Sequence, residues 1–249
     1  MRLKMGLNLT LNYSLNFNSS KRDKKKIKFI ILHYTGMKNE SHAIKKLCDP
    51  KSKVSSHYYI KTNGEILNLV PDFYEAWHAG KSRWKNYDSL NKYSLGIEMT
   101  NPGHQHGYKN FTSNQIKSLK RLLIHLMKKY KIGYKFVLGH SDISPDRKKD
   151  PGEKFPWKKL FKKQIGLWHN LNQRILLKNR NQVISFIEKN IFYKNLYKIG
   201  YSKNISKKNI NYLKKLTIAF QMRFRQELIN GIADKECLII SKNLTKKFL

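Results

Sequence analysis

The sequence lacks the main features of a disulfide-stabilised or membrane-spanning protein. Its two cysteines, Cys48 and Cys237, lie far apart, so we expect neither a disulfide framework nor a cysteine-based metal site. No run approaches the roughly 18 apolar residues that a membrane span requires. Asn and Ser interrupt the apolar part of MRLKMGLNLTLNYSLNF and no small-residue cleavage site follows, so no secretory signal peptide is evident. These absences predict a soluble or peripheral protein.

Acidic residues are also scarce. Asp and Glu total 16 against 51 Lys and Arg, which gives a net charge of +35. Such a charge attracts polyanions, including nucleic acid, anionic lipid and anionic cell-wall polymers. The lysines are scattered along the chain rather than clustered with aromatic residues, so nucleic acid is not expected as the primary ligand. An AT-rich genome would explain the excess of Lys, Asn and Ile equally well.

Several segments show the alternation of β-strands. Residues 27–33 are mostly apolar and predict a central strand that ends at His33. In SSHYYIKTNGEILNLV, two β-type runs flank Asn63-Gly64, a pair that favours a type I′ hairpin turn. Two further strands are expected, at residues 93–99 and 134–139.

Helical periodicity predicts the remaining organisation. Thr112 and Gln115 have capping-box spacing, and apolar residues then recur at helical intervals as far as Tyr130. Strands mixed with amphipathic helices predict an α/β fold with a mixed central sheet flanked by helices. The expected divisions are an N-terminal extension (1–24), an α/β domain (25–170), a polar, irregular linker (171–181) and a small helical domain (182–249), with helical patterns near 183–188, 207–224 and 234–244.

Three possible metal ligands follow the ends of predicted strands. His33 closes the first strand, His140 follows the fourth, and Asp150 lies in the loop that begins at His140. Ligands of α/β sheets collect at this rim. Two histidines and one carboxylate with an open fourth position are typical of catalytic zinc, so the pattern predicts one Zn²⁺ per chain.

Two more residues complete a possible hydrolytic site. Lys148 stands two residues before Asp150, so in an extended segment both side chains point the same way and the ammonium could stabilise an oxyanion. Glu98 ends another predicted strand and could transfer a proton from water to a leaving amine. Zinc lowers the pKa of bound water from about 15.7 to about 7, which suits the hydrolysis of a stable amide.

The strings IILHYTG, KVSSHYYI, AWHAGKSRW, LGIEMTNPGH and LGHSDISPDRKKDPGEKFPW resemble the type 2 N-acetylmuramoyl-L-alanine amidases, most closely their AmiD-like branch. The resemblance covers about residues 27–168. It implies zinc at His33, His140 and Asp150, with Glu98 as the acid/base residue and Lys148 as the oxyanion stabiliser. The run LTIAFQMRFRQELINGIADKE also resembles the three-helix peptidoglycan-binding domain of that branch.

The family resemblance implies hydrolysis of the amide between N-acetylmuramic acid and L-alanine in peptidoglycan or muropeptides. A periplasmic or cell-envelope location is then expected, although the absence of a lipobox cysteine keeps the cytoplasm as an alternative. A catalytically inactive muropeptide-recognition protein would be marked by a lost zinc ligand, and none is lost. The preference for polymer or fragment, the need for a 1,6-anhydro sugar and the oligomeric state stay open.

The substrate groove is harder to predict. Trp77 and Trp84 could line it or pack beneath a loop, and Tyr34 is a further candidate for substrate contact. His78 is expected in the groove wall or against substrate, because the family pattern argues against a ligand role. Two other predictions concern histidines outside the site: His57 packs in the interior, and His104 is exposed to solvent.

Overall fold

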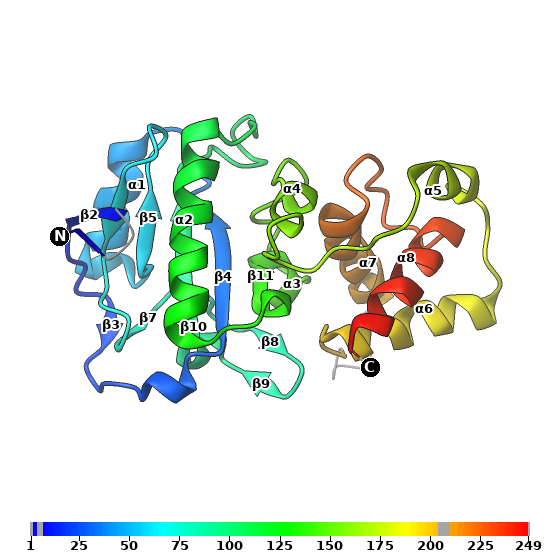
Figure 1. Ribbon diagram of the computed structural model, residues 1–249, viewed down its shortest axis with the longest axis horizontal. Helices are drawn as coiled ribbons and strands as arrows, with labels where there is room; N and C mark the ends of the chain where they lie inside the picture. Colours follow the sequence, from blue (N-terminus) through cyan, green and yellow to red (C-terminus); the bar gives the residue numbers. More distant parts are fainter. Residues whose placement is uncertain (1, 4–6, 204–209, 249) are drawn as a thin grey trace.

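The computed structural model describes residues 2–3, 7–203 and 210–248. A mixed β-sheet carries helices on both faces, and a bundle of helices packs beyond the β11 edge (Figure 1). The predicted fold, a mixed central sheet flanked by helices with a helical C-terminal part, is confirmed.

Among the described residues, the main sheet has seven strands in the order β1-β2-β6-β5-β10-β4-β11. β10 is parallel to both β5 and β4, β4 is parallel to β11, and β5 and β6 are antiparallel. The strands are β1 (Arg2–Leu3), β2 (Leu7–Leu11), β3 (Phe17–Asn18), β4 (Phe29–Tyr34), β5 (Tyr58–Ile60), β6 (Ile66–Asn68), β7 (Glu75–Ala76), β8 (Arg83–Trp84), β9 (Tyr87–Asp88), β10 (Ser94–Met99) and β11 (Val137–Gly139).

The α-helices divide between the two parts of the chain, with α1 to α4 beside the sheet and α5 to α8 in the bundle. They are α1 (Glu40–Cys48), α2 (Ser113–Tyr130), α3 (His140–Ile143), α4 (Trp157–Phe161), α5 (Gln173–Asn179), α6 (Phe186–Ile199), α7 (Ile210–Phe224) and α8 (Lys235–Thr245).

Helices α1 and α2 cover opposite faces of the sheet. The apolar side of α2 belongs to the main core, whereas α1 packs with Tyr59 in a smaller cluster. Glu98 of β10 is in register with both Tyr59 and His33. Because successive side chains of a strand alternate between faces, these three residues share the face covered by α1. The candidate site therefore lies opposite α2.

The predicted hairpin is confirmed, but its turn type is wrong. The Gly64 N–H donates to the Lys61 carbonyl at 2.9 Å, and Gly64 has a φ of +90°. A type I′ turn needs positive φ at both central residues, and Asn63 is not among the residues with positive φ. The hairpin packs on α2, where a Cβ on Gly64 would lie 2.8 Å from the Asn114 carbonyl oxygen. Glycine at position 64 therefore accommodates both the positive φ and the close approach of α2.

Helix α2 begins as predicted. The Thr112 hydroxyl accepts from the Gln115 N–H at 3.1 Å, and the Gln115 side chain accepts from the Thr112 N–H at 3.0 Å. The strand predicted after α2 is shorter than expected, because Tyr134–Phe136 form a turn of 3-10 helix before β11.

The N-terminal extension contributes strands that were not predicted. β2 pairs with β6, and β3 pairs with β7. The Leu-Asn-Leu-Thr-Leu alternation over residues 7–11 is the signal that would have indicated β2. Further along, the buried Arg22 donates to the Asp72 carbonyl at 2.9 Å and the Asn91 carbonyl at 2.8 Å. These bonds fasten the extension to the sheet domain.

The helical region differs from its predicted outline in two ways. The pattern near residues 183–188 marks only the start of α6, which continues to Ile199. The expectation of an irregular linker is also wrong, since α5 lies within residues 171–181. The Asn172 side chain accepts from the Arg174 N–H at 2.8 Å and Leu176 is buried, so a cap and an apolar anchor stabilise this short helix.

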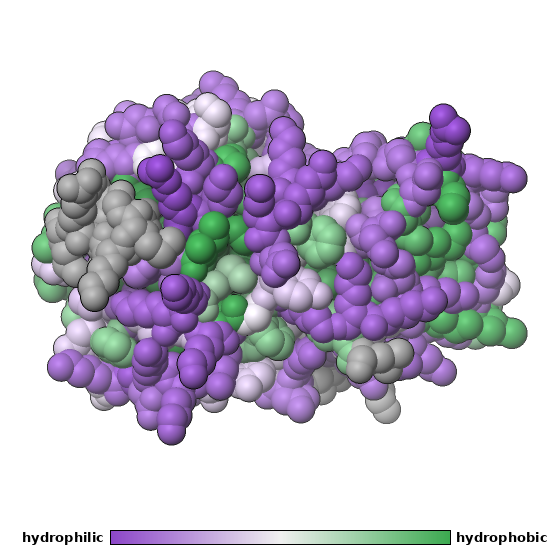
Figure 2. Space-filling view, viewed as in Figure 1, coloured by the Kyte–Doolittle hydropathy of each residue, from purple (hydrophilic) through white to green (hydrophobic). Residues whose placement is uncertain are grey.

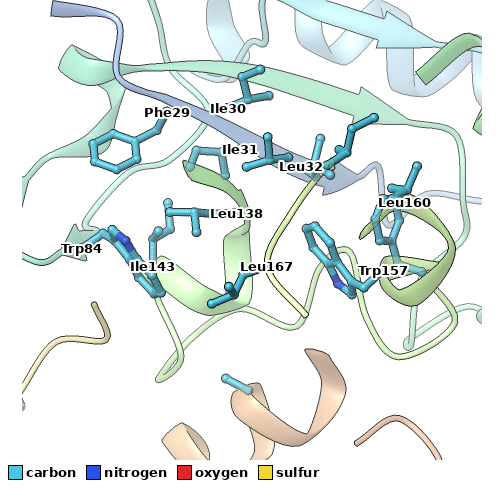
Figure 3. Close-up of a cluster of buried hydrophobic side chains, with 14 of the residues drawn as sticks. Phe29, Ile30, Ile31, Leu32, Trp84, Leu138, Ile143, Trp157, Leu160 and Leu167 are labelled. Atoms are coloured by element: carbon cyan, nitrogen blue, oxygen red, sulfur yellow. The ribbon is translucent and has the colours of Figure 1, made fainter. Parts of the chain in front are cut away.

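One hydrophobic core runs from the sheet into the bundle. Leu138, Ile143 and Leu167 lie between β4 and the bundle helices (Figure 3). At the same boundary, Trp84 packs edge-on against Tyr201 with ring centroids 5.0 Å apart. The bundle is therefore part of the same packed body as the sheet.

Hydrophilic side chains cover most of the face seen in Figure 2, while apolar side chains appear at the free end of the bundle. Three exposed apolar residues lie around the start of α6, namely Val183, Phe186 and Ile187, with exposures of 95%, 78% and 72%. Within the described ranges, no helix has both the length and the apolar character needed to cross a membrane.

Candidate metal centre and active site

The fold brings the three predicted ligands together. His33 Nδ1 lies 2.9 Å from His140 Nδ1 and 2.9 Å from Asp150 Oδ2. His140 Nδ1 lies 3.0 Å from Asp150 Oδ2, and all three residues are buried. Their positions follow from the topology, because β4 and β11 are adjacent and parallel and both end at this rim.

The spacing of these atoms fits one face of a metal coordination sphere. Tetrahedral zinc with bonds of roughly 2.0–2.1 Å has ligand atoms about 3.3 Å apart. The three observed separations of 2.9, 2.9 and 3.0 Å are close to that value. A groove of about 440 Å³ adjoins the three residues. The cluster is therefore compatible with a metal ion that faces a space for substrate.

Hydrogen bonds behind the cluster orient both imidazoles. His140 Nε2 lies 3.1 Å from the Ala79 carbonyl oxygen, which can only accept. The proton of neutral His140 is thus placed on Nε2, and Nδ1 keeps its lone pair for a metal. In His33, too, Nδ1 belongs to the cluster and Nε2 points away from it, where it lies 3.0 Å from His78 Nδ1.

His78 lies behind the cluster as a partner of His33. Its Nε2 is 3.2 Å from the Ser94 hydroxyl, which donates to the Leu90 carbonyl at 2.5 Å. Ser94 must then accept from His78 Nε2, which leaves His78 Nδ1 to accept from the His33 Nε2–H. A Cβ at position 96 would collide with the His78 ring, so Gly96 makes room for it. His78 thus lines the groove and supports the candidate metal ligand His33.

The charges in the cluster suit metal binding. Burial lowers the pKa of His33 to about 4, and the His140 imidazole contributes in the same direction. Burial alone would raise the pKa of Asp150, but the His140 and His33 imidazoles outweigh it and hold that pKa well below its usual range. A neutral His33 imidazole beside an ionised Asp150 carboxylate is the pair of protonation states in which these side chains bind metal.

Glu98 has an unusual environment. Its Oε2 is buried and has no hydrogen-bond partner among the described residues. Burial, followed by the Asp150 carboxylate, raises the pKa of Glu98 to about 8, while the Lys148 ammonium acts in the opposite direction. Buried polar atoms are nearly always paired, so an unpaired carboxyl with a raised pKa indicates a functional residue.

The predicted substrate contacts divide into two groups. Tyr34, Trp77 and His78 line the same groove as the three ligands, and so does Lys148, the predicted oxyanion stabiliser. Trp84 does not, since it is 2% exposed and packs against Tyr201 in the core. Of the two alternatives for Trp84, packing holds and substrate contact does not, because the bundle covers its ring.

His104 is a groove residue whose predicted exposure is wrong. His104 was expected in solvent, yet its side chain is only 22% exposed and accompanies the ligands in the groove lining. It lies 2.8 Å from the Tyr34 hydroxyl and 2.9 Å from a Glu153 carboxylate oxygen. Its loop follows the strand that carries Glu98, and this position at the rim is the signal that would have identified it.

The fold and the site define an α/β protein with a buried His-His-Asp cluster, compatible with a metal ion, beside an open groove. The chain belongs to the N-acetylmuramoyl-L-alanine amidase family, whose family model matches residues 23–153. The predicted family and enzyme class are confirmed.

Individual relatives extend the likeness over most of the chain. N-acetylmuramoyl-L-alanine amidase AmiD of Escherichia coli is 33% identical over 235 residues, covering 90% of this chain and 84% of AmiD. A structure of E. coli AmiD in complex with anhydro-N-acetylmuramic acid-L-Ala-D-γ-Glu-L-Lys matches with a TM-score of 0.78 and 30% identity, covering 92% of this chain and 91% of the other. Pseudomonas aeruginosa AmpDh3 in complex with anhydromuramic pentapeptide matches with the same TM-score and identity, covering 96% and 98%.

Proposed function

We propose that this chain is a zinc-dependent amidase that cleaves the bond between N-acetylmuramic acid and L-alanine in peptidoglycan or its fragments. The observation that carries the proposal is the triangle of His33, His140 and Asp150 donor atoms, 2.9–3.0 Å apart. It shares its groove with Glu98, whose Oε2 has no hydrogen-bond partner in the part of the chain that the structure describes. The muropeptide ligands of the AmiD and AmpDh3 complexes support the choice of substrate.

The donor set favours zinc over magnesium or calcium. The latter two ions prefer oxygen ligands, whereas two imidazoles and one carboxylate are an ordinary set for catalytic zinc. His33, His140 and Asp150 would hold the ion, which when bound polarises water and the scissile carbonyl.

The chain's own residues would then manage protons and charge. Glu98 takes a proton from the attacking water and passes it to the leaving amine. A cation nearby would lower the pKa of Glu98 from about 8 toward neutrality, the range that suits such a shuttle. Lys148 places an ammonium in the groove, where it stabilises the oxyanion of the tetrahedral intermediate. Tyr34 and Trp77 border the groove and contact the substrate.

Two further parts of the proposed function are where the enzyme works and what the helical bundle binds. We infer that the enzyme works in the periplasm or cell envelope, where intact peptidoglycan lies, and that the helical region 182–249 binds the polymer. A cytoplasmic enzyme acting on released fragments is the alternative. Cell fractionation with an antibody to the chain distinguishes the two locations.

The direct test is digestion of sacculi and of a defined anhydro-muropeptide, with products identified by mass. Wild type is compared before and after chelation, after zinc is restored, and with Glu98→Gln and the surface control Glu65→Gln. We expect release of intact stem peptide that chelation abolishes and zinc restores. Glu98→Gln should retain zinc but release stem peptide about 100- to 10,000-fold more slowly than wild type, whereas Glu65→Gln should match wild type.

A zinc-loaded chain that binds muropeptide without releasing stem peptide would refute the catalytic proposal in favour of a recognition protein. A nucleic-acid complex that resists moderate salt, together with no muropeptide turnover, would instead identify the +35 charge as functional. The relative rates on sacculi and fragment measure the preference for polymer.

A further inference from the structure

Asp142 connects the ligand-bearing loop to the helical bundle. It lies in α3, two residues after His140, and its side chain is 1% exposed. Its Oδ2 accepts from the Gly139 N–H at 2.7 Å and forms an ion pair with Arg223 of α7. Its Oδ1 accepts from the Tyr201 hydroxyl, just after α6, at 2.7 Å. Two of its three partners therefore come from the bundle.

Arg223 also forms a direct hydrogen bond with the backbone just before His140. Its other terminal nitrogen donates to the Val137 carbonyl in β11 at 3.1 Å. The guanidinium lies 4.0 Å from the centroid of the Trp157 ring, and its side chain is 3% exposed. Arg223 thus bonds to the chain both before and after His140.

This support matters because α3 cannot hold its own position. It is a single turn of four residues, and so short a helix is unstable without tertiary contacts. The Ser141 N–H donates to the Asp150 carbonyl at 2.9 Å, so the start of the loop is bonded to the residue that supplies the third ligand. A shift of α3 would displace both His140 and Asp150.

We propose that Arg223 and Tyr201 are positioning residues for the metal centre. Through Asp142 they hold the backbone from Gly139 to Asp150 in the arrangement that makes His140 and Asp150 converge with His33. The inference rests on the proposed metal site and gives the bundle a task beyond polymer binding. It also predicts that zinc binding is coupled to the contacts between the bundle and α3, so that a variant that weakens these contacts also lowers the affinity for zinc.

The test uses the full chain with four variants. Arg223→Met removes the ion pair, Arg223→Lys restores its charge, and Tyr201→Phe removes one hydroxyl. Arg225→Met is the matched control, because the Arg225 side chain is fully buried and paired with Asp234, yet all its partners lie within residues 228–236 of the bundle. Both methionine variants lose a buried ion pair, but only one of these pairs reaches the ligand loop.

Zinc affinity is measured by competition with a chelator, well below the thermal midpoint of every variant. We expect Arg223→Met to bind zinc roughly tenfold more weakly than wild type and Tyr201→Phe a few-fold more weakly. Arg223→Lys should recover part of the loss. Arg225→Met should stay within about twofold of wild type even where its thermal midpoint falls.

Hydrogen exchange on the metal-free proteins gives an independent readout. Amides of residues 139–150 should exchange faster in Arg223→Met than in wild type or Arg225→Met. If wild type binds no zinc, the proposed function fails, and exchange still decides the positioning role. Unchanged zinc affinity in Tyr201→Phe and Arg223→Met, or an equal loss in Arg225→Met, overturns the inference. If Arg223→Met does not fold, Tyr201→Phe decides.

Discussion

Glu98 stands opposite His33 in the parallel register of β10 and β4, so a buried carboxyl and a candidate metal ligand share one face of the sheet. The carboxyl has no partner for its Oε2 within the described residues, and its pKa is raised to about 8. An unperturbed Glu has a pKa of about 4.3. At a pH between these two values, Glu98 of the metal-free protein therefore carries a proton in the folded state and has lost it in the unfolded chain.

This pairing predicts how the metal-free enzyme responds to alkali. Between about pH 4.5 and 8 the folded state binds more protons at Glu98 than the unfolded state, so the free energy of unfolding falls as pH rises. Glu98→Gln removes this dependence. The decrease in the free energy of unfolding between about pH 6.5 and 8.5 should therefore be about 2 kcal/mol smaller in the variant than in wild type. Urea unfolding of chelated protein at both pH values measures it. Glu65→Gln is the control, and identical losses in wild type and Glu98→Gln would contradict the assignment.

The histidine behind the cluster gives a second prediction. His78→Ala removes the acceptor for His33 Nε2 and should weaken zinc binding by about 10- to 100-fold. His78→Asn places an amide oxygen near the lost Nδ1 and should restore much of the affinity. Chelator competition provides the measurement. Equal losses in both variants would show that ring packing, not the hydrogen bond, is what His78 supplies.

His57 is one of the buried histidines that make stability depend on pH in the acid range. His57 is fully buried, and its Nδ1 accepts from the Gly96 N–H at 2.9 Å. Burial, then the Arg22 charge, lowers its pKa to about 3. Between about pH 6.5 and 3 only the unfolded chain binds this proton, so stability falls as pH falls. His57→Asn keeps an acceptor and should reduce the loss between about pH 7 and 5 by about 2 kcal/mol.

Urea titrations at both pH values test this, with exposed His42→Asn as the control. A loss of stability in His57→Asn as steep as in wild type would mean that His57 is already protonated in the folded state.

Two tryptophans should separate stability from substrate binding. Trp84 is buried against Tyr201, so Trp84→Ala should lower the free energy of unfolding by about 3–5 kcal/mol with little change in KM. Trp77 lines the groove, and its indole N–H donates to Asn18 at 3.0 Å. Trp77→Ala should raise KM for muropeptide with a smaller change in stability. Urea unfolding and steady-state kinetics decide, and a reversed pattern would reinstate Trp84 as a substrate contact.

Local signals predicted much of the sheet domain. The alternation of residues 27–33, the Asn63-Gly64 turn position and the Thr112–Gln115 capping box depend on neighbours within a few residues, and each element formed. The type of hairpin turn did not follow from the dipeptide, because Gly64 is the last residue of the Lys61–Gly64 turn and not one of its two central residues. The predicted α6 is too short because its apolar stripe is blurred: Phe186 and Ile187 are apolar yet exposed, and Asn195 is polar yet buried.

The sequence by itself determined which side chains are available for chemistry and that His33, His140 and Glu98 stand at the ends of strands, since chain order and two-residue periodicity establish both. Only the tertiary structure decided that His78 supports His33, that Trp84 is core, and that Asp142 is held by Arg223. These relations join residues 45 and 81 positions apart in the chain or depend on which surface a distant helix covers. The physical reason is that burial, hydrogen-bond direction and pKa belong to the packed environment, and no local pattern encodes them.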